Sequence, residues 1–139
     1  MKMVLKNGPR WLPHNALAAQ HDTAIDAHFM RHALALGARG AGRTWPNPAV
    51  GAVIVRFDDG GPRVVGTGYT QPGGRPHAEA MAIDAAGLAC MDATMYVTLE
   101  PCAHRSVRGA TPCCERTMLS GVRRVVSAMS DPNPHIAGL

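Results

Sequence analysis

The first regular pattern of apolar positions along the chain begins near residue 23. Apolar side chains recur there every three or four residues, which is the spacing of an amphipathic helix. They are Ile25, Phe29, Ala33 and Leu36. Thr23 is a suitable capping residue, and Gly37 or Gly40 is a suitable end. Residues 1–22 show no such period, so we expect a poorly ordered tail ahead of a single domain that occupies residues 23–139.

Apolar runs of strand length alternate with shorter helical segments after that helix. The expected strands are residues 49–57, 62–69, 94–99 and 122–129, and the expected further helices are residues 77–86 and 113–119. A turn of Asp and Gly residues joins the first two strands into a hairpin. This α-β-β-α-β-α-β order is typical of a layered α/β domain with a mixed sheet.

Composition and charge narrow the class of protein. The chain has 139 residues, of which 46% are hydrophobic and 17% are charged, so it is one globular domain rather than an acidic disordered chain. It carries 14 basic and 10 acidic residues, and 12 of the basic ones are Arg. Because the guanidinium group suits phosphate and carboxylate, these charges favour an anionic partner, either a phosphorylated small molecule or nucleic acid. A basic surface that only keeps the protein soluble is the alternative.

The cysteines and the lack of a long apolar run indicate where the protein works. No run approaches the ~18 residues of a membrane helix, and the N-terminus lacks the apolar stretch of a signal peptide. We therefore expect a cytoplasmic protein with no membrane partner. Its 4 cysteines should then be reduced, which favours metal binding or catalysis over disulfides.

One histidine, two cysteines and one glutamate form the strongest chemical pattern. His77 and Cys113 each begin a predicted helix, and Cys102 follows a predicted strand. One His and two Cys are a three-ligand zinc set that leaves a fourth position for water, whose pKa zinc lowers to about 7. Glu79, two residues after His77, can serve beside that water as a general acid and base. His-x-Glu followed by Pro-Cys-x-x-Cys is the signature of zinc deaminases, which this pattern resembles.

Two features of this pattern leave alternatives open. Ten residues separate Cys102 from Cys113, whereas the signature has two. Cys114 is adjacent to Cys113 and is the alternative ligand, although we prefer Cys113. A structural zinc site closed by a fourth ligand, His104 or Cys114, is the competing interpretation. We expect Cys90 to pack in the core.

Several linked motifs resemble the deaminase family of riboflavin biosynthesis, within the cytidine deaminase-like superfamily. They are TWPNPAVG at 44–51, GGRPHAE at 73–79, VTLEPCAH at 97–104, TPC at 111–113, GVRRVV at 121–126 and DPNP at 131–134. The resemblance covers about residues 25–139. It implies a three-layer α/β/α cytidine deaminase-like fold with a mixed sheet. We expect the family's last strand and helix to be missing from this chain, and no reductase domain to be present in it.

The resemblance also implies an activity. It is the zinc-dependent hydrolytic deamination of 2,5-diamino-6-ribosylamino-4(3H)-pyrimidinone 5′-phosphate to 5-amino-6-(5-phosphoribosylamino)uracil. By position in the motifs, His77, Cys102 and Cys113 are the implied zinc ligands, and Glu79 is the implied proton carrier. The phosphate of this substrate agrees with the basic composition.

The implied substrate contacts are Asn47, His104 and Arg108. Arg105 is the alternative to Arg108, because the loop after Cys102 is about two residues longer than is usual in the family. Thr70 stands seven residues before His77, where the family often has a histidine.

The sequence also allows two alternative functions. One alternative is a nucleoside or tRNA deaminase of the same superfamily, and another is a non-catalytic zinc-binding fragment. Aromatic residues make up only 4% of the chain, which disfavours base stacking, so we expect no nucleic-acid partner. The superfamily commonly assembles, which makes a homo-oligomer a further expectation. Of Arg123 and Arg124, at the start of a strand, we expect one to face solvent.

Overall fold

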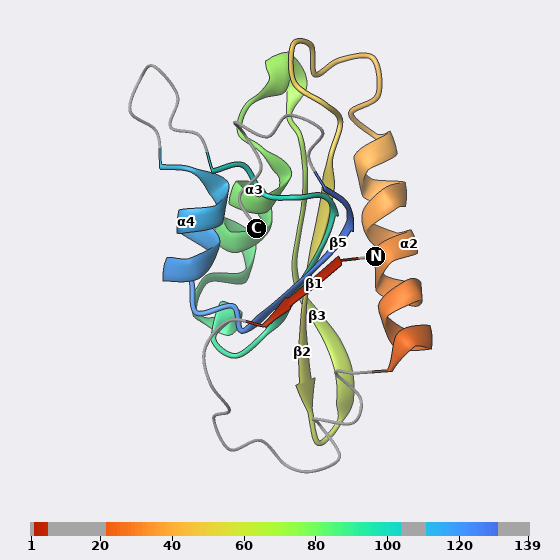
Figure 1. Ribbon diagram of the computed structural model, residues 1–139, viewed down its shortest axis with the longest axis vertical. Helices are drawn as coiled ribbons and strands as arrows, with labels where there is room; N and C mark the ends of the chain where they lie inside the picture. The colour runs from red at the N-terminus through yellow and green to blue at the C-terminus, as the bar shows by residue number, and fades with distance from the viewer. Residues whose placement is uncertain (1, 6–21, 104–110, 131–139) are drawn as a thin grey trace.

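The protein is a three-layer α/β/α sandwich (Figure 1). The structure, a computed structural model, describes residues 2–5, 22–103 and 111–130. Helix α2 (Thr23–Ala38) covers one face of the sheet, and α3 (Ala78–Ala86) and α4 (Cys113–Leu119) lie on the other face. Two short 3₁₀ helices, η1 (Pro72–Gly74) and η2 (Gly87–Cys90), flank α3. The predicted layering is confirmed.

The central sheet is mixed and has five strands in the order β1-β5-β4-β2-β3. The strands are β1 (Lys2–Leu5), β2 (Gly51–Asp58), β3 (Gly61–Tyr69), β4 (Thr94–Leu99) and β5 (Arg124–Met129). Strands β4 and β5 run parallel, while the pairs β1–β5, β2–β3 and β2–β4 are antiparallel. The hairpin expected from the Asp/Gly turn is the β2–β3 pair.

Strand β1 was not anticipated from the sequence, which predicts only a tail for this stretch. It pairs antiparallel with β5 at the edge of the sheet, with Met3 opposite Val126. A strand of four residues gives almost no periodic signal, and this one exists through a partner more than a hundred residues away. Strand β1 is therefore the edge strand of the described sheet, next to β5.

The starts of α2 and α3 differ from the expected ones by a single residue. The carboxylate of Asp22, rather than Thr23, caps α2, because its Oδ1 accepts a hydrogen bond of 2.8 Å from the backbone N–H of Ala24. Helix α3 begins at Ala78, which leaves His77 as its N-cap residue. Pro112 lies at the N-cap of α4, which begins at Cys113 as predicted. Two of the expected chemical groups thus sit where helices begin.

Two glycines let the helices lie directly against the sheet. A Cβ atom at Gly51 of β2 would lie 1.8 Å from the carbonyl oxygen of Ala33 in α2. A Cβ atom at Gly68 of β3 would lie 2.3 Å from the carbonyl oxygen of Ala78 in α3. Larger side chains at these positions would push the helices away, so Gly68 places the start of α3 close to the sheet.

The core consists of two apolar clusters, one on each face of the sheet. Successive residues of β4 alternate between them, as the pleat requires. Met95 and Val97 pack under α3, whereas Tyr96 packs under α2 beside Phe29. Cys90 is fully buried in the cluster under α3, as expected.

Arg123 and Arg124 are both buried, so the expectation that one of them faces solvent is wrong. Arg124 is 1% exposed and donates a hydrogen bond of 2.8 Å from Nη1 to Oδ1 of Asp26. The Tyr96 hydroxyl donates to the same oxygen at 2.7 Å. Asp26 lies on α2, nearly a hundred residues earlier in the chain, and local sequence gave no sign of this partner.

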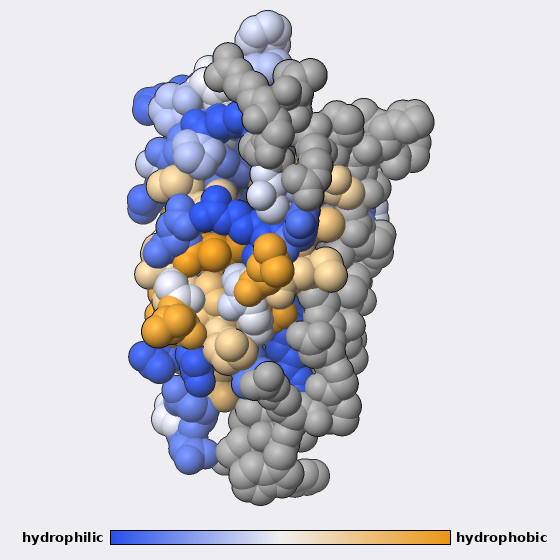
Figure 2. Space-filling view, turned by 90° about the vertical axis from the view of Figure 1, so that its left-hand side faces the viewer, coloured by the Kyte–Doolittle hydropathy of each residue, from blue (hydrophilic) through white to orange (hydrophobic). Residues whose placement is uncertain are grey.

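The surface on the side of α3 and α4 is partly apolar. Figure 2 shows hydrophobic side chains among hydrophilic ones on this side of the molecule. The exposed large apolar residues that η2, α4 and their flanks contribute are Leu88, Met91, Met118 and Leu119. In the described parts of the chain, no helix has the length and apolar character needed to span a membrane.

Candidate active site

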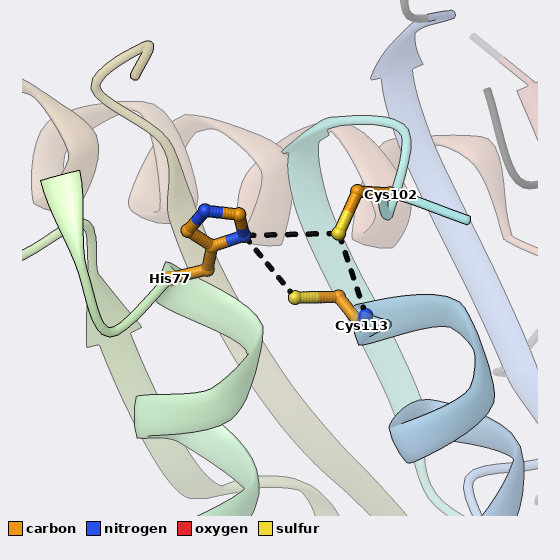
Figure 3. Close-up of side chains that lie close together, drawn as sticks. All are labelled: His77, Cys102 and Cys113. Atoms are coloured by element: carbon orange, nitrogen blue, oxygen red, sulfur yellow. Dashed lines mark hydrogen bonds between the residues drawn. The ribbon is translucent and has the colours of Figure 1, made fainter. Parts of the chain in front are cut away.

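Three elements bring one histidine and two cysteines together (Figure 3). His77 lies just before α3, Cys102 follows β4, and Cys113 begins α4. The Nδ1 atom of His77 lies 3.3 Å from Sγ of Cys113 and 3.8 Å from Sγ of Cys102. All three potential ligand atoms lie within 4.8 Å of one another. The residues that the sequence singles out as a zinc set therefore meet in space.

The spacing of these atoms fits a tetrahedral metal site. Zinc bonds of about 2.3 Å to sulfur and about 2.0–2.1 Å to nitrogen, at tetrahedral angles, put ligand atoms roughly 3.5–3.8 Å apart. The two distances from His77 Nδ1 match this separation to within a few tenths of an ångström. Among the described residues, no fourth His, Cys, Asp or Glu joins the group. A zinc ion held by these three side chains would have a fourth coordination position that the described residues do not fill, and catalytic zinc sites keep that position for water or substrate.

Cys113, rather than Cys114, points toward the histidine. The Cys113 side chain is buried, and its backbone N–H donates to Sγ of Cys102 at 3.4 Å. The backbone N–H of Cys114 donates instead to the carbonyl oxygen of Cys102 at 3.0 Å, which ties α4 to the end of β4. Cys114 is half-buried and lies outside the three-residue group.

Hydrogen bonds among the three side chains shift their pKa values. The hydrogen bond from the Cys113 thiol lowers the pKa of Cys102 to about 4. The same hydrogen bond, together with burial, raises the pKa of Cys113 above its ordinary value. A hydrogen bond with Cys102 raises the pKa of His77. The group thus holds protons in a shared network that a divalent cation would displace, since metal ligands must be deprotonated.

Glu79 lies in the first turn of α3, beside this group. Its side chain is buried, and burial raises the pKa of its carboxyl group to about 7. A carboxyl group with a pKa near neutrality can both accept and donate a proton during a reaction. Glu79 is not one of the three clustered ligands, so its carboxylate is available for proton transfer.

A cavity of about 140 Å³ opens next to the cluster. The part of its wall nearest the cluster contains His77, Glu79 and Cys102. The rest of the wall is contributed by Asn47, Pro48, Val50, Thr70, Arg75, Leu99 and Glu100. The cavity therefore extends from the side chains of His77, Glu79 and Cys102 to the loop that carries Asn47.

Asn47 connects two walls of the cavity. Its Nδ2 donates to the carbonyl oxygen of Gly74 at 2.8 Å and lies 3.5 Å from Nε2 of His77. The Thr44 hydroxyl donates to the backbone carbonyl of Asn47 at 2.7 Å, which holds this loop in place. The Thr70 hydroxyl accepts a hydrogen bond of 2.9 Å from the backbone N–H of Val50, so it braces the same wall.

The remaining predicted contacts and two unpredicted ones complete the picture. His104 and Arg108 lie outside the described residues. Arg75 and Glu100 line the cavity, although they were not selected from the sequence. Each stands immediately before a Pro-His or Pro-Cys pair of the motif, and this adjacency was the available signal.

The fold and this group of side chains define a class of protein. A His/Cys/Cys set with a neighbouring glutamate, on a mixed sheet covered by helices, is typical of the zinc-dependent nucleobase deaminases. Residues 23–129 match the cytidine and deoxycytidylate deaminase zinc-binding region. The chain belongs to this family.

Several similar proteins are named as proteins of riboflavin biosynthesis. The chain is 51% identical over 114 residues to the riboflavin biosynthesis protein RibD of Escherichia coli, a match that covers 81% of the chain and 29% of that relative. It is 43% identical over 114 residues to the diaminohydroxyphosphoribosylamino-pyrimidine deaminase of Buchnera aphidicola, with 81% of the chain and 73% of that relative covered. The resemblance to the riboflavin-pathway deaminases is confirmed.

Solved structures agree with the fold. One crystal form of Acinetobacter baumannii RibD has a TM-score of 0.73 and 44% identity, and the match covers 81% of this chain and 30% of that one. The Aspergillus oryzae Rib2 deaminase has a TM-score of 0.62 at 26% identity, covering 78% of this chain and 74% of that one. The chain thus spans about 30% of the length of the RibD proteins that it matches.

Proposed function

We propose that this chain removes the 2-amino group of 2,5-diamino-6-ribosylamino-4(3H)-pyrimidinone 5′-phosphate by hydrolysis, with zinc as its cofactor. The observation that carries the proposal is the meeting of His77 Nδ1 with the sulfurs of Cys102 and Cys113, beside buried Glu79 at a cavity wall. The 43% identity to a relative named as the deaminase of this type of pyrimidine supports the choice of substrate.

The three clustered side chains are the proposed zinc ligands. When bound, zinc supplies a Lewis acid that makes water a usable nucleophile at neutral pH. The burial of Cys113 and the position of His77 at the helix start hold the donor atoms at fixed separations. Ligands from three different elements also couple metal binding to correct folding.

Glu79 is the proposed proton carrier. Its carboxylate takes the proton of the attacking water and delivers it to the exocyclic nitrogen, so that the departing group is neutral ammonia. The near-neutral pKa that burial produces suits both steps. Since Glu79 lines the cavity together with His77, the transferred proton has only a short path.

Asn47, His104 and Arg108 are the proposed substrate contacts. Asn47 lines the cavity, and its amide is held between Gly74 and His77, which suits it to orient the pyrimidine ring. His104 and Arg108 are proposed from their positions in the motifs alone. Thr70 braces Val50 through its hydroxyl and gives this wall a shorter side chain than the family's histidine.

The setting of the reaction follows from the same chemistry. We propose that the protein works in the cytoplasm, where thiols stay reduced and available to zinc. A phosphorylated small molecule is the proposed partner, and no nucleic acid is expected. A homo-oligomer stays a prediction, which the apolar surface of Leu88, Met118 and Leu119 supports.

A substrate comparison tests the proposed function. Zinc-loaded protein is incubated with the diaminopyrimidinone ribosylamino phosphate, with cytidine, with deoxycytidylate and with tRNA, and released ammonia is measured. We expect turnover of the diaminopyrimidinone with a kcat/KM at least about 100-fold above that for the others, since a matched polar site discriminates strongly. Comparable or higher turnover of cytidine or tRNA would instead favour the nucleoside or tRNA deaminase.

A further inference from the structure

The cavity wall carries one guanidinium group. Among the described residues that line the cavity, Arg75 is the only Arg or Lys, whereas Glu79 and Glu100 are acidic and buried. The proposed substrate combines an uncharged pyrimidine ring with a phosphate that carries a charge of about −1.5 to −2 at neutral pH. The two carboxyl groups make the deep wall unfavourable for that phosphate, and Arg75 makes its own part of the wall favourable.

The backbone that carries Arg75 is held in place from both sides. Gly74 has a φ of +92°, and a Cβ there would lie 2.6 Å from the carbonyl oxygen of Thr44. The carbonyl of Gly74 accepts the hydrogen bond from Asn47, and the backbone N–H of Gln71 donates to the carbonyl of Pro76 at 3.1 Å. The loop is therefore closed across the base of Arg75 and anchored to the loop of Asn47.

The side chain of Arg75 is exposed, although the residue lines the cavity. An exposed side chain that also lines the cavity lies at the rim of the cavity. Arg75 stands two residues before His77 in the sequence. A substrate whose reacting carbon lies against His77 and Glu79 must send its ribosyl phosphate toward the open side of the cavity. The rim is where a long, charged and partly hydrated side chain can meet a phosphate without a desolvation cost as high as in the interior.

We propose that Arg75 binds the 5′-phosphate of the substrate and thereby selects phosphorylated over dephosphorylated substrate. The guanidinium group donates two parallel N–H bonds to phosphate oxygens, which a lysine cannot reproduce. This inference rests on the proposed function and names the part of the site that recognises the phosphate. It is separate from the assignment of Arg108 in the loop of residues 104–110.

The test compares Arg75→Gln with wild type on the phosphorylated substrate and on its dephosphorylated form. We expect kcat/KM for the phosphorylated substrate to fall about 10–100-fold, mainly through KM, because a charge-assisted hydrogen bond is lost. Turnover of the dephosphorylated form should change less than about 2-fold, since no contact to it is removed. Arg75→Lys should recover part of the loss. Arg63→Gln, at an exposed position of β3, is the matched control and should leave both rates unchanged.

Two results would overturn the assignment. One is an equal loss on both substrates, which would place Arg75 in general support of the site. The other is unchanged discrimination in Arg75→Gln together with its loss in Arg108→Gln. Calorimetric titration of zinc-loaded protein with ribose 5-phosphate separates this inference from the proposed function. If wild type releases no ammonia but binds ribose 5-phosphate, and Arg75→Gln weakens that binding at least about 10-fold, the phosphate site stands and the proposed reaction fails. If Arg75→Gln leaves that binding unchanged, the phosphate site fails.

Discussion

The buried ion pair between Asp26 and Arg124 makes a quantitative prediction about stability. The pair joins α2 to β5, and Tyr96 of β4 donates to the same carboxylate, so one charged group links three elements. Exposure is 5% for Asp26 and 1% for Arg124. Removal of either partner alone leaves the other charge buried without its counterion, which is far more costly than the loss of an exposed pair.

The magnitude follows from that burial. Breaking a buried pair by removing one partner costs about 3–5 kcal/mol, so we expect this loss for Asp26→Ala and for Arg124→Met. The double variant removes both charges and should be at least about 2 kcal/mol more stable than the sum of the single effects predicts. Tyr96→Phe deletes one hydrogen bond and should cost about 1 kcal/mol.

Urea unfolding of the zinc-loaded protein, followed by circular dichroism, measures these free energies. Arg63→Ala removes an exposed partner of Asp58 at 3.4 Å and serves as control, with an expected loss below about 1 kcal/mol. If Asp26→Ala does not fold, Asp26→Asn keeps the shape and tests the charge alone. Additive single effects, or a loss for Arg124→Met no larger than that of the control, would refute the reasoning.

Other expected outcomes concern the metal and the packing of α3. Cys113→Ser should lose most of its bound zinc by metal analysis, whereas Cys114→Ser should retain it; the reverse pattern would make Cys114 the ligand. Removal of zinc with a chelator should lower the unfolding free energy by about 2.7 kcal/mol or more where free zinc exceeds its Kd 100-fold. Gly68→Ala should cost about 1–3 kcal/mol of unfolding free energy, because the new Cβ would lie 2.3 Å from the carbonyl oxygen of Ala78. The control Gly60→Ala meets only an Asp58 oxygen at 3.4 Å and should change the unfolding free energy by less than about 0.5 kcal/mol. Equal effects of the two variants in urea unfolding would contradict the packing of α3 on β3.

The chemical site was largely readable from the sequence, because its chemistry requires particular residue types at short spacing. His77 and Glu79 lie two residues apart at the start of α3, and the Pro-Cys pairs follow the end of β4 and mark the start of α4. The layered fold was also readable, since the apolar runs have strand length and the helical segments between them are clear. Motif order then connected these pieces to one family.

Two features that were not predicted from the sequence, strand β1 and the burial of Arg124, depend on residues far apart in the chain. Strand β1 exists through pairing with β5, and the burial of Arg124 depends on Asp26 of α2. A local window contains neither partner. Arg75 is a different case, because it stands two residues before His77 and its adjacency to the motif was a signal that the sequence did offer.

The most direct test of the account compares ammonia release by wild type and Glu79→Gln, both loaded with zinc and assayed on the diaminopyrimidinone ribosylamino phosphate. Glutamine keeps the shape of the side chain but cannot accept the proton, so the account predicts equal zinc content and a kcat reduced about 10²–10⁴-fold. Asp84→Asn, an exposed change on the same helix, should retain full activity. A Glu79→Gln variant that binds zinc and keeps wild-type kcat would contradict the central claim.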